Sequence, residues 1–566
     1  AVKSHNKFYG MNYAGIFKSK LSSDATLENV TANYGQICDV SANMGWNAGI
    51  KKWGQQAEIA IDKECLQFVD YTVFHPTKDS PSDYCRSHPL IDQKADGTIK
   101  ARLVCGKTVH GSEIEYNVPL YSPVIDSKLI YMMLSLCLKH KNDLSVLDVK
   151  GAFFKAMMDA NEEVYVHMEP KIAERMVRLK PEWRKFLRKD KSMMVISDKA
   201  WYGTAVASAL WNKEITATLT NLCGYNQHSM CKCLFYKHVN GRLCFILLHV
   251  DDLGISMPPD GVEKDRVVRI LEKKYETLKK KEGDFVIYIG LEIRRCRTTN
   301  QFYISMRERM SKLLVDNNFT KSTSTKIIFP ASNSGTFTHP TDAEIEDLLP
   351  TNDITKYRSV VMTLNYLSVV YVSIKFYISW LATRQSAPSR SDWKKVLHLL
   401  KHLSSCMDDE LVIGAMFDNP TIHVYTDASF DVYRDSKSHS GIAVFIDGCR
   451  AAVFCSSNKQ HCLSRSSCDA EIVTCEQGTF IGSYLRDVLD ELCITCTVKH
   501  HQDNESCITL VDSGTASYDR KERHVVRRIN YMHDYFRLLS NYSVLIFCPT
   551  EDMYADVLTT AYGGSL

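Results

Sequence analysis

Two adjacent carboxylates interrupt one of the most apolar stretches of the sequence. Residues 243–257, LCFILLHVDDLGISM, carry Asp251 and Asp252, and a second apolar stretch, LSVLDV, delivers Asp148. Carboxylates that meet at the edge of a core repel one another and resist ionising unless a cation neutralises them. Mg²⁺ or Mn²⁺ suits such oxygen ligands, and a pair of these ions serves in-line phosphoryl displacement. The set predicts nucleotidyl transfer, although an Asp at a strand-to-strand turn is also common without any metal.

Four further acids lie in separate elements of the C-terminal region. They are Asp427 in VYTDASF, Glu471 in SRSSCDAEIV, Asp503 in HQDNESCI and Asp556 in YADVLTT. Only folding can bring residues so far apart together, and any one alone would be a surface acid or a helix cap. Asp512 in TLVDSG competes with Asp503 as the third member of the set.

The length and composition bound the class of protein. A chain of 566 residues is too long for one hydrophobic core and predicts about three or four domains. Lys and Arg outnumber Asp and Glu by only 69 to 66, so net charge neither requires nor excludes a polyanionic partner. The start, AVKSHNKFYG, has no initiator Met and no apolar signal-peptide core, which indicates a fragment or a piece released from a longer precursor.

The 20 cysteines come without a secretory signal, so they are most simply reduced thiols of an intracellular protein. Two groups have the ligand types of a zinc site but lack a second well-spaced pair, and ordinary thiols are the favoured interpretation. These groups are Cys493, Cys496, His500 and His501, and His228, Cys231 and Cys233.

Hydrophobic periodicity predicts the elements that position these residues. Residues 46–61 have the apolar spacing of one docked helix, and helical and strand patterns alternate from about 124 to 260. A charge-laced helix is expected from Pro259 to Lys281. The uncharged run from Ser359 to Ile374 is too short and too polar to span a membrane and predicts a buried helix. The last 145 or so residues have the alternation of an α/β domain.

Several motifs together resemble those of a known family. DVKGAFF at 148–154, LLHVDDLGI at 247–255 and YIGLEI at 288–293 are similar to the palm motifs of a reverse transcriptase, specifically the polymerase of copia-type LTR retrotransposons. The similarity extends through ARLV at 101–104 and AWYG at 200–203. The resemblance implies that Asp148 and Asp251 hold the metal pair, with Asp252 as the less direct carboxylate.

The same resemblance implies a nucleotide site and a primer grip. Phe153 would pack under the nucleotide sugar and exclude a 2′-hydroxyl, and Lys100 and Arg102 would reach the triphosphate. A core aromatic at Phe153 and a solvated hairpin at Lys100 and Arg102 stay open as alternatives. Near the base would lie Tyr202 and Gly203. The hairpin that grips the primer end would comprise Tyr288, Gly290, Leu291 and Glu292.

The surroundings of the C-terminal acids resemble the ribonuclease H domain that follows the polymerase in copia-type elements. This implies that Asp427, Glu471, Asp503 and Asp556 bind two Mg²⁺ ions and hydrolyse the RNA strand of an RNA/DNA hybrid. A dense basic cluster is then expected to contact hybrid phosphates, with a solvated helix start as the alternative. Its members are Arg520, Lys521, Arg523, His524, Arg527 and Arg528.

The expected architecture is an α+β right-hand polymerase with fingers, palm and a thumb-like helical region, followed by an α/β RNase H-like domain. The expected boundaries are an extension at 1–45, fingers and palm at 46–300, thumb-like and connecting helices at 301–415, and an RNase H domain at 420–566.

The expected activity is RNA- and DNA-templated DNA polymerisation with degradation of hybrid RNA, for retrotransposon replication. Two Mg²⁺ or Mn²⁺ ions per site are the expected cofactors, and RNA template, DNA or RNA primer, RNA/DNA hybrid and dNTPs the expected partners, with no membrane and with homodimerisation left open. The resemblance implies a cytoplasmic location within virus-like particles and passage into the nucleus. Departures from the family at His249, AVAS (205–208) and SIKFYI (373–378) leave open a degraded element that only binds nucleic acid, or only cleaves hybrids.

Overall fold

The computed structural model describes residues 44–93, 97–109, 121–159, 163–204, 206–319, 341–514 and 523–561. All of these belong to one compact unit, Val40–Leu566. Of the residues named above, Ala205, Arg520 and Lys521 lie outside the described residues, as does the 1–45 extension except for its last two residues.

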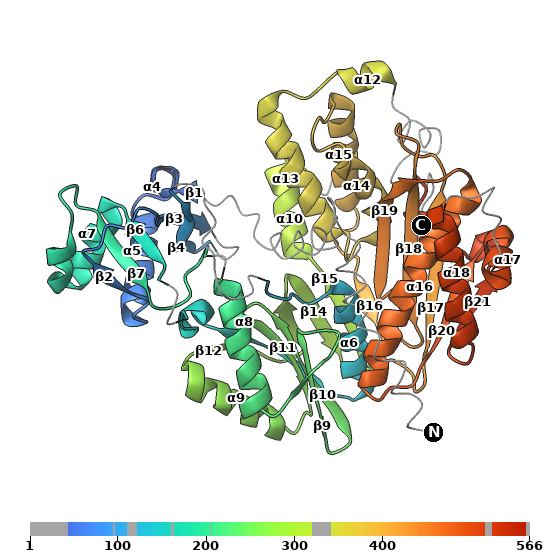
Figure 1. The fold of residues 1–566 in the computed structure, drawn as a ribbon, viewed down its shortest axis with the longest axis horizontal. Coiled ribbons are helices and arrows are strands. Elements are labelled where there is room, and N and C mark those ends of the chain that lie inside the picture. Colours follow the sequence, from blue (N-terminus) through green and yellow to red (C-terminus); the bar gives the residue numbers. More distant parts are fainter. Residues whose placement is uncertain are drawn as a thin grey trace. The chain divides into compact units, whose positions relative to one another are not determined.

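The first described region is a mixed sheet covered by helices (Figure 1). Its strand order is β1-β3-β6-β7-β2, and β4 pairs with β3. The expected single helix over 46–61 is wrong in one respect, because Gly54 at φ +50° ends one helix and precedes the next. The elements are β1 (Met44–Gly45), α4 (Trp46–Trp53), α5 (Gln55–Asp70), β2 (Phe74–Thr77), β3 (Cys85–Gln93), β4 (Ile99–Thr108), β6 (Tyr165–Met168), α7 (Pro170–Leu179) and β7 (Met193–Ser197).

A second sheet carries the apolar strands that end in carboxylates. Its order is β12-β5-β11-β10-β9-β8, and its strands pair antiparallel throughout. Helix α6, which precedes β5, is buried continuously from Leu129 to Leu138. The elements are α6 (Ser127–Lys139), β5 (Asp143–Val149), α8 (Ala207–Ala217), β8 (Asn226–Gln227), β9 (Leu234–Val239), β10 (Arg242–His249), β11 (Asp252–Met257), α9 (Val262–Tyr275) and β12 (Leu278–Lys281).

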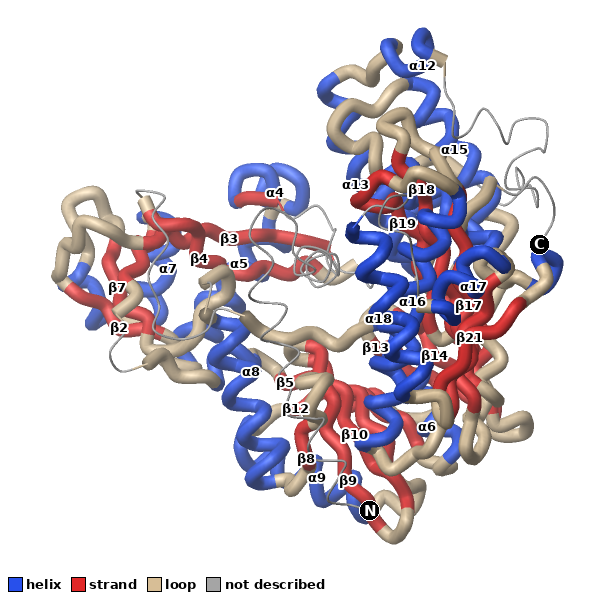
Figure 2. The backbone as a smooth tube through the Cα atoms, turned by 45° about the vertical axis from the view of Figure 1, so that its right-hand side comes forward, coloured by secondary structure: helices blue, strands red, loops and turns tan. Residues whose placement is uncertain are grey.

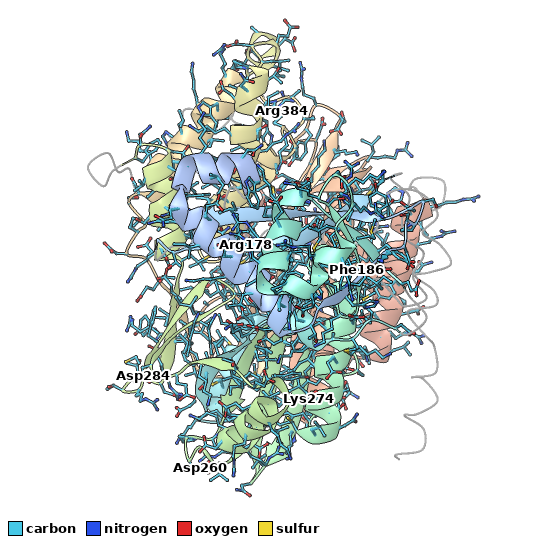
Figure 3. The ribbon with its side chains drawn as sticks, turned by 90° about the vertical axis from the view of Figure 1, so that its left-hand side faces the viewer. Arg178, Phe186, Asp260, Lys274, Asp284 and Arg384 are labelled. Atoms are coloured by element: carbon cyan, nitrogen blue, oxygen red, sulfur yellow. The ribbon has the colours of Figure 1, made fainter. Side chains whose placement is uncertain are left out.

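The expected helix over 259–281 is too long. The Asp260 carboxylate accepts a hydrogen bond from the Val262 amide (3.1 Å) at the start of α9, and Lys274 lies in its last turn, so both charges complement the helix dipole (Figure 3). Glu276 then takes φ +68° and ends the helix. The Lys-rich residues 278–281 form β12, because they hydrogen-bond to the otherwise free edge of β5.

A third sheet and a helical region follow. The sheet has the order β13-β14-β15-β16. The uncharged run 359–374 is not one helix, because α13 ends at Leu367. No helix in the described part of the chain is long and apolar enough to cross a membrane. The elements are β13 (Phe285–Tyr288), β14 (Leu291–Cys296), β15 (Gln301–Ser305), α10 (Arg307–Asp316), α12 (Asp342–Glu346), α13 (Thr351–Leu367), α14 (Lys375–Ala382), α15 (Arg390–Leu403) and β16 (Leu411–Ile413).

The C-terminal region is an α/β domain, as expected. Its sheet has the order β19-β18-β17-β20-β21, in which β17, β20 and β21 run parallel and β18 and β19 are antiparallel to their neighbours. Helices α16 and α18 pack beside this sheet (Figure 2). The elements are β17 (Thr421–Ser429), β18 (Lys437–Ile446), β19 (Phe454–Leu463), α16 (Ser467–Glu491), β20 (Thr497–Gln502), α17 (Glu505–Ser513), α18 (Arg523–Leu538) and β21 (Ser543–Phe547).

Hydrogen bonds join the loop after β8 of the second sheet, which is called the palm sheet below, to the end of α16. The Ser229 amide donates to Glu491 Oε1 (2.9 Å), and His228 Nε2 lies 3.3 Å from the Val488 carbonyl. His228 Nδ1 accepts from the Met230 and Cys231 amides. Both ring nitrogens of His228 are therefore engaged in structural hydrogen bonds, which supports the ordinary interpretation of the HSMCKC segment over a zinc site.

Two glycines let α16 approach the sheet. A Cβ at Gly478 would lie 2.3 Å from Thr426 Cγ2, and one at Gly482 would lie 2.9 Å from the His500 ring. Contacts this short do not occur in folded proteins, so only glycine permits the observed distance between α16 and β17. The close approach places Glu471, on the same helix, beside β17.

We predict that Gly478→Ala lowers the free energy of unfolding by about 1–3 kcal/mol, because the added methyl overpacks the helix against the strand. Thermal unfolding followed by circular dichroism measures this. Gln477→Ala, an exposed change on the same helix, is the control and should leave the midpoint unchanged. Equal midpoints for the two variants would contradict the close-packing account.

Candidate active sites

Strand register builds a row of polar side chains across the palm sheet. Asp148 on β5 lies directly opposite Asp252 on β11, Asp252 lies opposite His249 on β10, and Lys279 on β12 lies opposite Asp148. Residues opposite one another in antiparallel strands have Cβ atoms about 4.5–5.5 Å apart. The sheet therefore lines up a cation, two carboxylates and an imidazole.

The third acid, Asp251, sits in the two-residue turn between β10 and β11. The turn forces Val250 to φ +54°, a conformation that is unfavourable for a β-branched residue. The indole N–H of buried Trp211 donates to the Val250 carbonyl at 2.6 Å. Trp211 thus stabilises the turn that presents Asp251 beside Asp148 and Asp252, a role the sequence gave no signal for.

The electrostatics of the palm acids fit a divalent cation. Burial, followed by repulsion from Asp251 and Asp148, raises the pKa of Asp252 to about 6, and burial and Asp148 raise the pKa of Asp251. Lys279 Nζ lies 3.2 Å from Asp148 Oδ2 and supplies part of the missing positive charge. An oxygen-only donor set that resists ionisation in this way is one that Mg²⁺ or Mn²⁺ would stabilise.

His249 adds no charge to this site near neutral pH. Burial lowers the pKa of its imidazole to about 4, and Nδ1 has no hydrogen-bond partner among the described residues. The ring is therefore neutral at pH 7.

The residues expected to bind the nucleotide lie near the palm acids. Lys100 and Arg102 on β4 lower the pKa of Asp251, which shows that their charges reach it. The rings of Phe153 and Tyr202 meet edge to face, with centroids 5.1 Å apart. Phe153 belongs to the short 3₁₀ segment Ala152–Lys155 that follows β5. Their contacts with a nucleotide stay predictions.

Gly203 is required by the backbone around it. Its φ is +88°, and a Cβ there would lie 2.3 Å from the Cys105 carbonyl oxygen. The Cys105 amide donates to the Tyr202 carbonyl at 2.7 Å. The Tyr202–Gly203 turn is thereby fixed to β4, the strand that carries Lys100 and Arg102.

Glu64 is a further buried acid near these residues. It lies on α5 and accepts a hydrogen bond from the Leu103 amide on β4 at 3.1 Å. Burial raises its pKa to about 7, while Lys100 and Arg102 lower it. The apolar spacing of α5 did not indicate that an acid on this helix would face β4.

Hydrogen bonds and buried side chains anchor the hairpin that is expected to grip the primer. The buried Tyr288 hydroxyl donates to the Leu247 carbonyl (2.9 Å), and Leu291 is also buried. Glu292 accepts from the Glu308 amide at the start of α10 (2.8 Å). Gly290 turns the hairpin at φ +71°. These side chains support the hairpin, so any contact with a primer falls to its backbone and exposed edge.

The second site brings three of its four expected acids together. Asp427, Glu471 and Asp503 each offer a carboxylate oxygen, and these oxygens lie within 4.8 Å of one another. In the described part of the chain this is the one cluster of His, Cys, Asp and Glu side chains that converges so tightly. Asp427 lies near the end of β17, opposite Gly441 of β18, Glu471 lies in the second turn of α16, and Asp503 follows β20.

The other two candidates differ in position. Asp556 lies in the 3₁₀ segment Asp556–Leu558, and its charge raises the pKa of both Asp427 and Asp503. Asp512 is exposed on α17 and is not part of the converging group. The geometry therefore favours Asp503 over Asp512 as the third acid.

Neighbouring donors hold these carboxylates. The Ala428 amide donates to Glu471 Oε1 (3.1 Å), and the Gln502 amide side chain donates to Glu471 Oε2 (3.3 Å). Burial, Asp427 and Asp503 still raise the pKa of Glu471 well above its ordinary range. Burial also raises the pKa of Asp427 to about 6. Carboxyl groups in this state fit a divalent cation that would neutralise them.

The described part of the basic cluster lies on α18. Arg523 and Arg527 are exposed, whereas Arg528 is held by Glu476 at 3.4 Å. The two exposed guanidinium groups are thus free of that pairing and accessible to phosphates, and contact with a hybrid stays a prediction.

The CITC segment is not a converging ligand group. His500 and His501 are consecutive on β20 and point to opposite faces of the sheet. His500 is buried against Tyr535 and Phe536, while the His501 ring stacks on Tyr425, 4.1 Å between centroids. The ordinary interpretation of these residues therefore holds among the described residues.

Comparison with known proteins shows which family the region around the first site is similar to. Residues 85–330 match the family model described as reverse transcriptase (RNA-dependent DNA polymerase). This part of the chain, which contains the palm row, is similar to the reverse transcriptase family.

Over most of its length the chain is similar to transposon polyproteins. It is 23% identical over 476 residues to the "Retrovirus-related Pol polyprotein from transposon RE2" of Arabidopsis thaliana, covering 82% of this chain and 30% of that protein. It is 24% identical over 476 residues to the "Retrovirus-related Pol polyprotein from transposon TNT 1-94" of Nicotiana tabacum, covering 81% and 33%. The chain spans about a third of the length of these relatives. The chain is thus related to retrotransposon Pol polyproteins, as its motifs predicted.

Two solved structures are similar at low identity. An RNase H1 isolated from compost aligns over 24% of this chain and 91% of its own, with 18% identity and a TM-score of 0.19. A prototype foamy virus protease-reverse transcriptase aligns over 88% of this chain and 53% of its own, with 11% identity and a TM-score of 0.27.

The raised pKa values predict how the second site responds to pH. A divalent cation must displace protons from Asp427 and Glu471, so affinity for Mg²⁺ should rise from pH 5 to 7, by up to about tenfold per pH unit for each proton displaced. Titration calorimetry in two buffers of different ionisation enthalpy measures both the affinity and the protons released.

Without metal, stability should change in the opposite sense. Because the folded-state pKa of Asp427 lies above its unfolded value, the folded state binds more protons, and stability falls as pH rises from about 4 to about 6. Asp427→Asn should flatten both dependences. Affinity that is independent of pH, with no proton release, would contradict the raised pKa values.

Proposed function

We propose that the first site is a DNA polymerase that copies RNA or DNA templates. The observation that carries this proposal is the cross-strand register that sets Asp148 opposite Asp252 beside the Asp251 turn, within the residues that match the reverse transcriptase family. Such a row of acids favours bound divalent cations, and cations held there would in turn bind the triphosphate of a nucleotide at a primer end.

Each neighbouring residue has a role in this proposal. Arg102 and Lys100, which lie on β4, neutralise the triphosphate. A backbone hydrogen bond joins this strand to the Tyr202–Gly203 turn. Phe153, in contact with Tyr202, occupies the space beneath the sugar and excludes a 2′-hydroxyl. When bound, two divalent ions would supply charge neutralisation and Lewis-acid activation for the displacement. Asp148, Asp251 and Asp252 would hold them, and Lys279 would leave Asp148 as they bind.

The second site is proposed to hydrolyse the RNA strand of RNA/DNA hybrids. The converging oxygens of Asp427, Glu471 and Asp503 support this role, with Asp556 as the fourth acid. Gln502 and the Ala428 amide orient Glu471 for it. Arg523 and Arg527 supply accessible positive charge for the hybrid backbone. Both activities would serve the replication of a retrotransposon inside the cell.

Primer extension on an RNA template with dNTPs and Mg²⁺ tests the polymerase. We expect Asp251→Asn combined with Asp252→Asn to lower the extension rate by more than about a hundredfold, because carboxylates that act together in the reaction are lost. Asp265→Asn, exposed on α9, is the matched control and should extend like the native chain. No extension by the native chain, or equal extension by the double variant, would reject the polymerase.

Cleavage of a fluorescent RNA/DNA hybrid tests the nuclease separately. Glu471→Gln keeps the shape of the side chain but removes its charge, so cleavage should fall by more than about a hundredfold while primer extension is retained. Asp534→Asn, exposed on α18, should cleave normally. Unchanged cleavage by Glu471→Gln would show that this site is not the nuclease. Cleavage without extension would identify a chain that acts only as a hybrid nuclease.

A further inference from the structure

A buried hydrogen-bonded chain runs from the β17–β18 connection to the segment that carries Asp556. Tyr433 Oη lies 2.7 Å from His439 Nδ1, and His439 Nε2 lies 2.7 Å from Ser457 Oγ. Ser457 Oγ lies 2.7 Å from the Leu558 carbonyl oxygen. His439 is fully buried, and Ser457 and Tyr433 are nearly so.

The direction of every hydrogen bond in the chain follows from the acceptor at its end, the Leu558 carbonyl. A carbonyl oxygen can only accept, so the Ser457 hydroxyl donates its proton to Leu558. Ser457 Oγ must then accept from His439, which places the ring proton on Nε2. His439 Nδ1 in turn accepts from the Tyr433 hydroxyl. Burial lowers the pKa of His439 to about 3, so this neutral tautomer persists at physiological pH.

The chain ends where the fourth acid is placed. Leu558 closes the 3₁₀ segment that begins with Asp556. The next residue, Thr559, donates its hydroxyl proton to the Asp427 carboxylate, and its carbonyl accepts from Ser429 Oγ at 3.0 Å. One short segment therefore carries Asp556 and contacts Asp427.

The segment also lies against β18 itself. A Cβ at Gly441 would come within 2.6 Å of Thr559 Cγ2 and 2.9 Å of the Ala555 carbonyl oxygen. Gly441, two residues after His439 on β18, is thus in direct contact with the Asp556 segment. Both ring nitrogens of His439 take part in this hydrogen-bonded chain, and the Ser457 hydroxyl connects it to the segment.

A second buried histidine in the same domain provides a contrast. His500 is also almost completely buried, yet neither of its ring nitrogens has a hydrogen-bond partner among the described residues. It fills space under α18. His439 differs because both of its nitrogens are committed to a chain that ends at the Asp556 segment.

We propose that Tyr433, His439 and Ser457 are positioning residues for the second site. They set the position of Asp556 relative to Asp427, and thereby the affinity of the second site for a divalent cation. This inference rests on the proposed nuclease function for its meaning, but the positioning itself can be measured without cleavage. Removing a side chain that orients the metal ligands without binding the metal itself typically lowers metal affinity about 10–100-fold.

The test uses the full polypeptide with His439→Leu, which removes the hydrogen bonds to Tyr433 and Ser457, and separately with Ser457→Ala, which removes those to His439 and the Leu558 carbonyl. In the metal-free protein, hydrogen exchange of peptides covering residues 553–561 should become at least about tenfold faster. Titration calorimetry should show affinity for Mg²⁺ at the second site reduced about tenfold. Primer extension should be unchanged.

Two further variants separate positioning from loss of stability. His439→Gln keeps one acceptor and one donor and should restore most of the protection and affinity, whereas His500→Leu should change neither, even if its unfolding midpoint falls equally. Unchanged exchange and affinity in both His439→Leu and Ser457→Ala would overturn the proposal, as would the same changes in His500→Leu. If the native chain fails to cleave hybrids, the proposed nuclease function fails, while exchange and calorimetry still decide the positioning.

Discussion

Repulsion between carboxylates held at the edge of a core is the constraint on which both sites depend. In the palm it is relieved in part by Lys279, which the register of β12 sets opposite Asp148. In the C-terminal domain it is relieved by hydrogen-bond donors, the Ala428 amide and Gln502 at Glu471 and Thr559 at Asp427. A partner that neutralises some charge keeps the acids together, and the charge left over is what draws a divalent cation.

The two sheets meet this constraint in different ways. In the palm, adjacent antiparallel strands and a two-residue turn bring the acids together, so one strained residue, Val250, and its bond to Trp211 decide where Asp251 points. In the C-terminal domain, the acids come from a strand, a helix and two strand-following segments, so the distance of α16 from β17 decides the geometry. Gly478 sets that distance. The first site is sensitive to a turn and the second to helix packing.

The fold class and the relationship to retrotransposon Pol polyproteins could be predicted from the sequence, because apolar strands that end in acids leave a local signal. The supporting residues could not. The Lys-rich run 278–281 has the composition of a helix end, and only the free edge of β5 makes it a strand that delivers Lys279. Glu64 and His439 face inward because of tertiary packing. The hydrogen-bond partner of a single acid or imidazole in an apolar segment cannot be predicted from the sequence. The domain boundaries and residue roles stay predictions.

Helix α16 connects the second site to the loop that follows β8. Glu471 lies near its start, and Glu491, at its last residue, accepts hydrogen bonds from Ser229 in the palm. Twenty residues of α-helix separate these acids, or about 30 Å at 1.5 Å per residue. A helix buried along one face and fixed at both ends resists bending, since its glycines are in contact with β17 and β20. The separation of Glu471 from Ser229, in the loop after β8, is therefore set by the length of one helix.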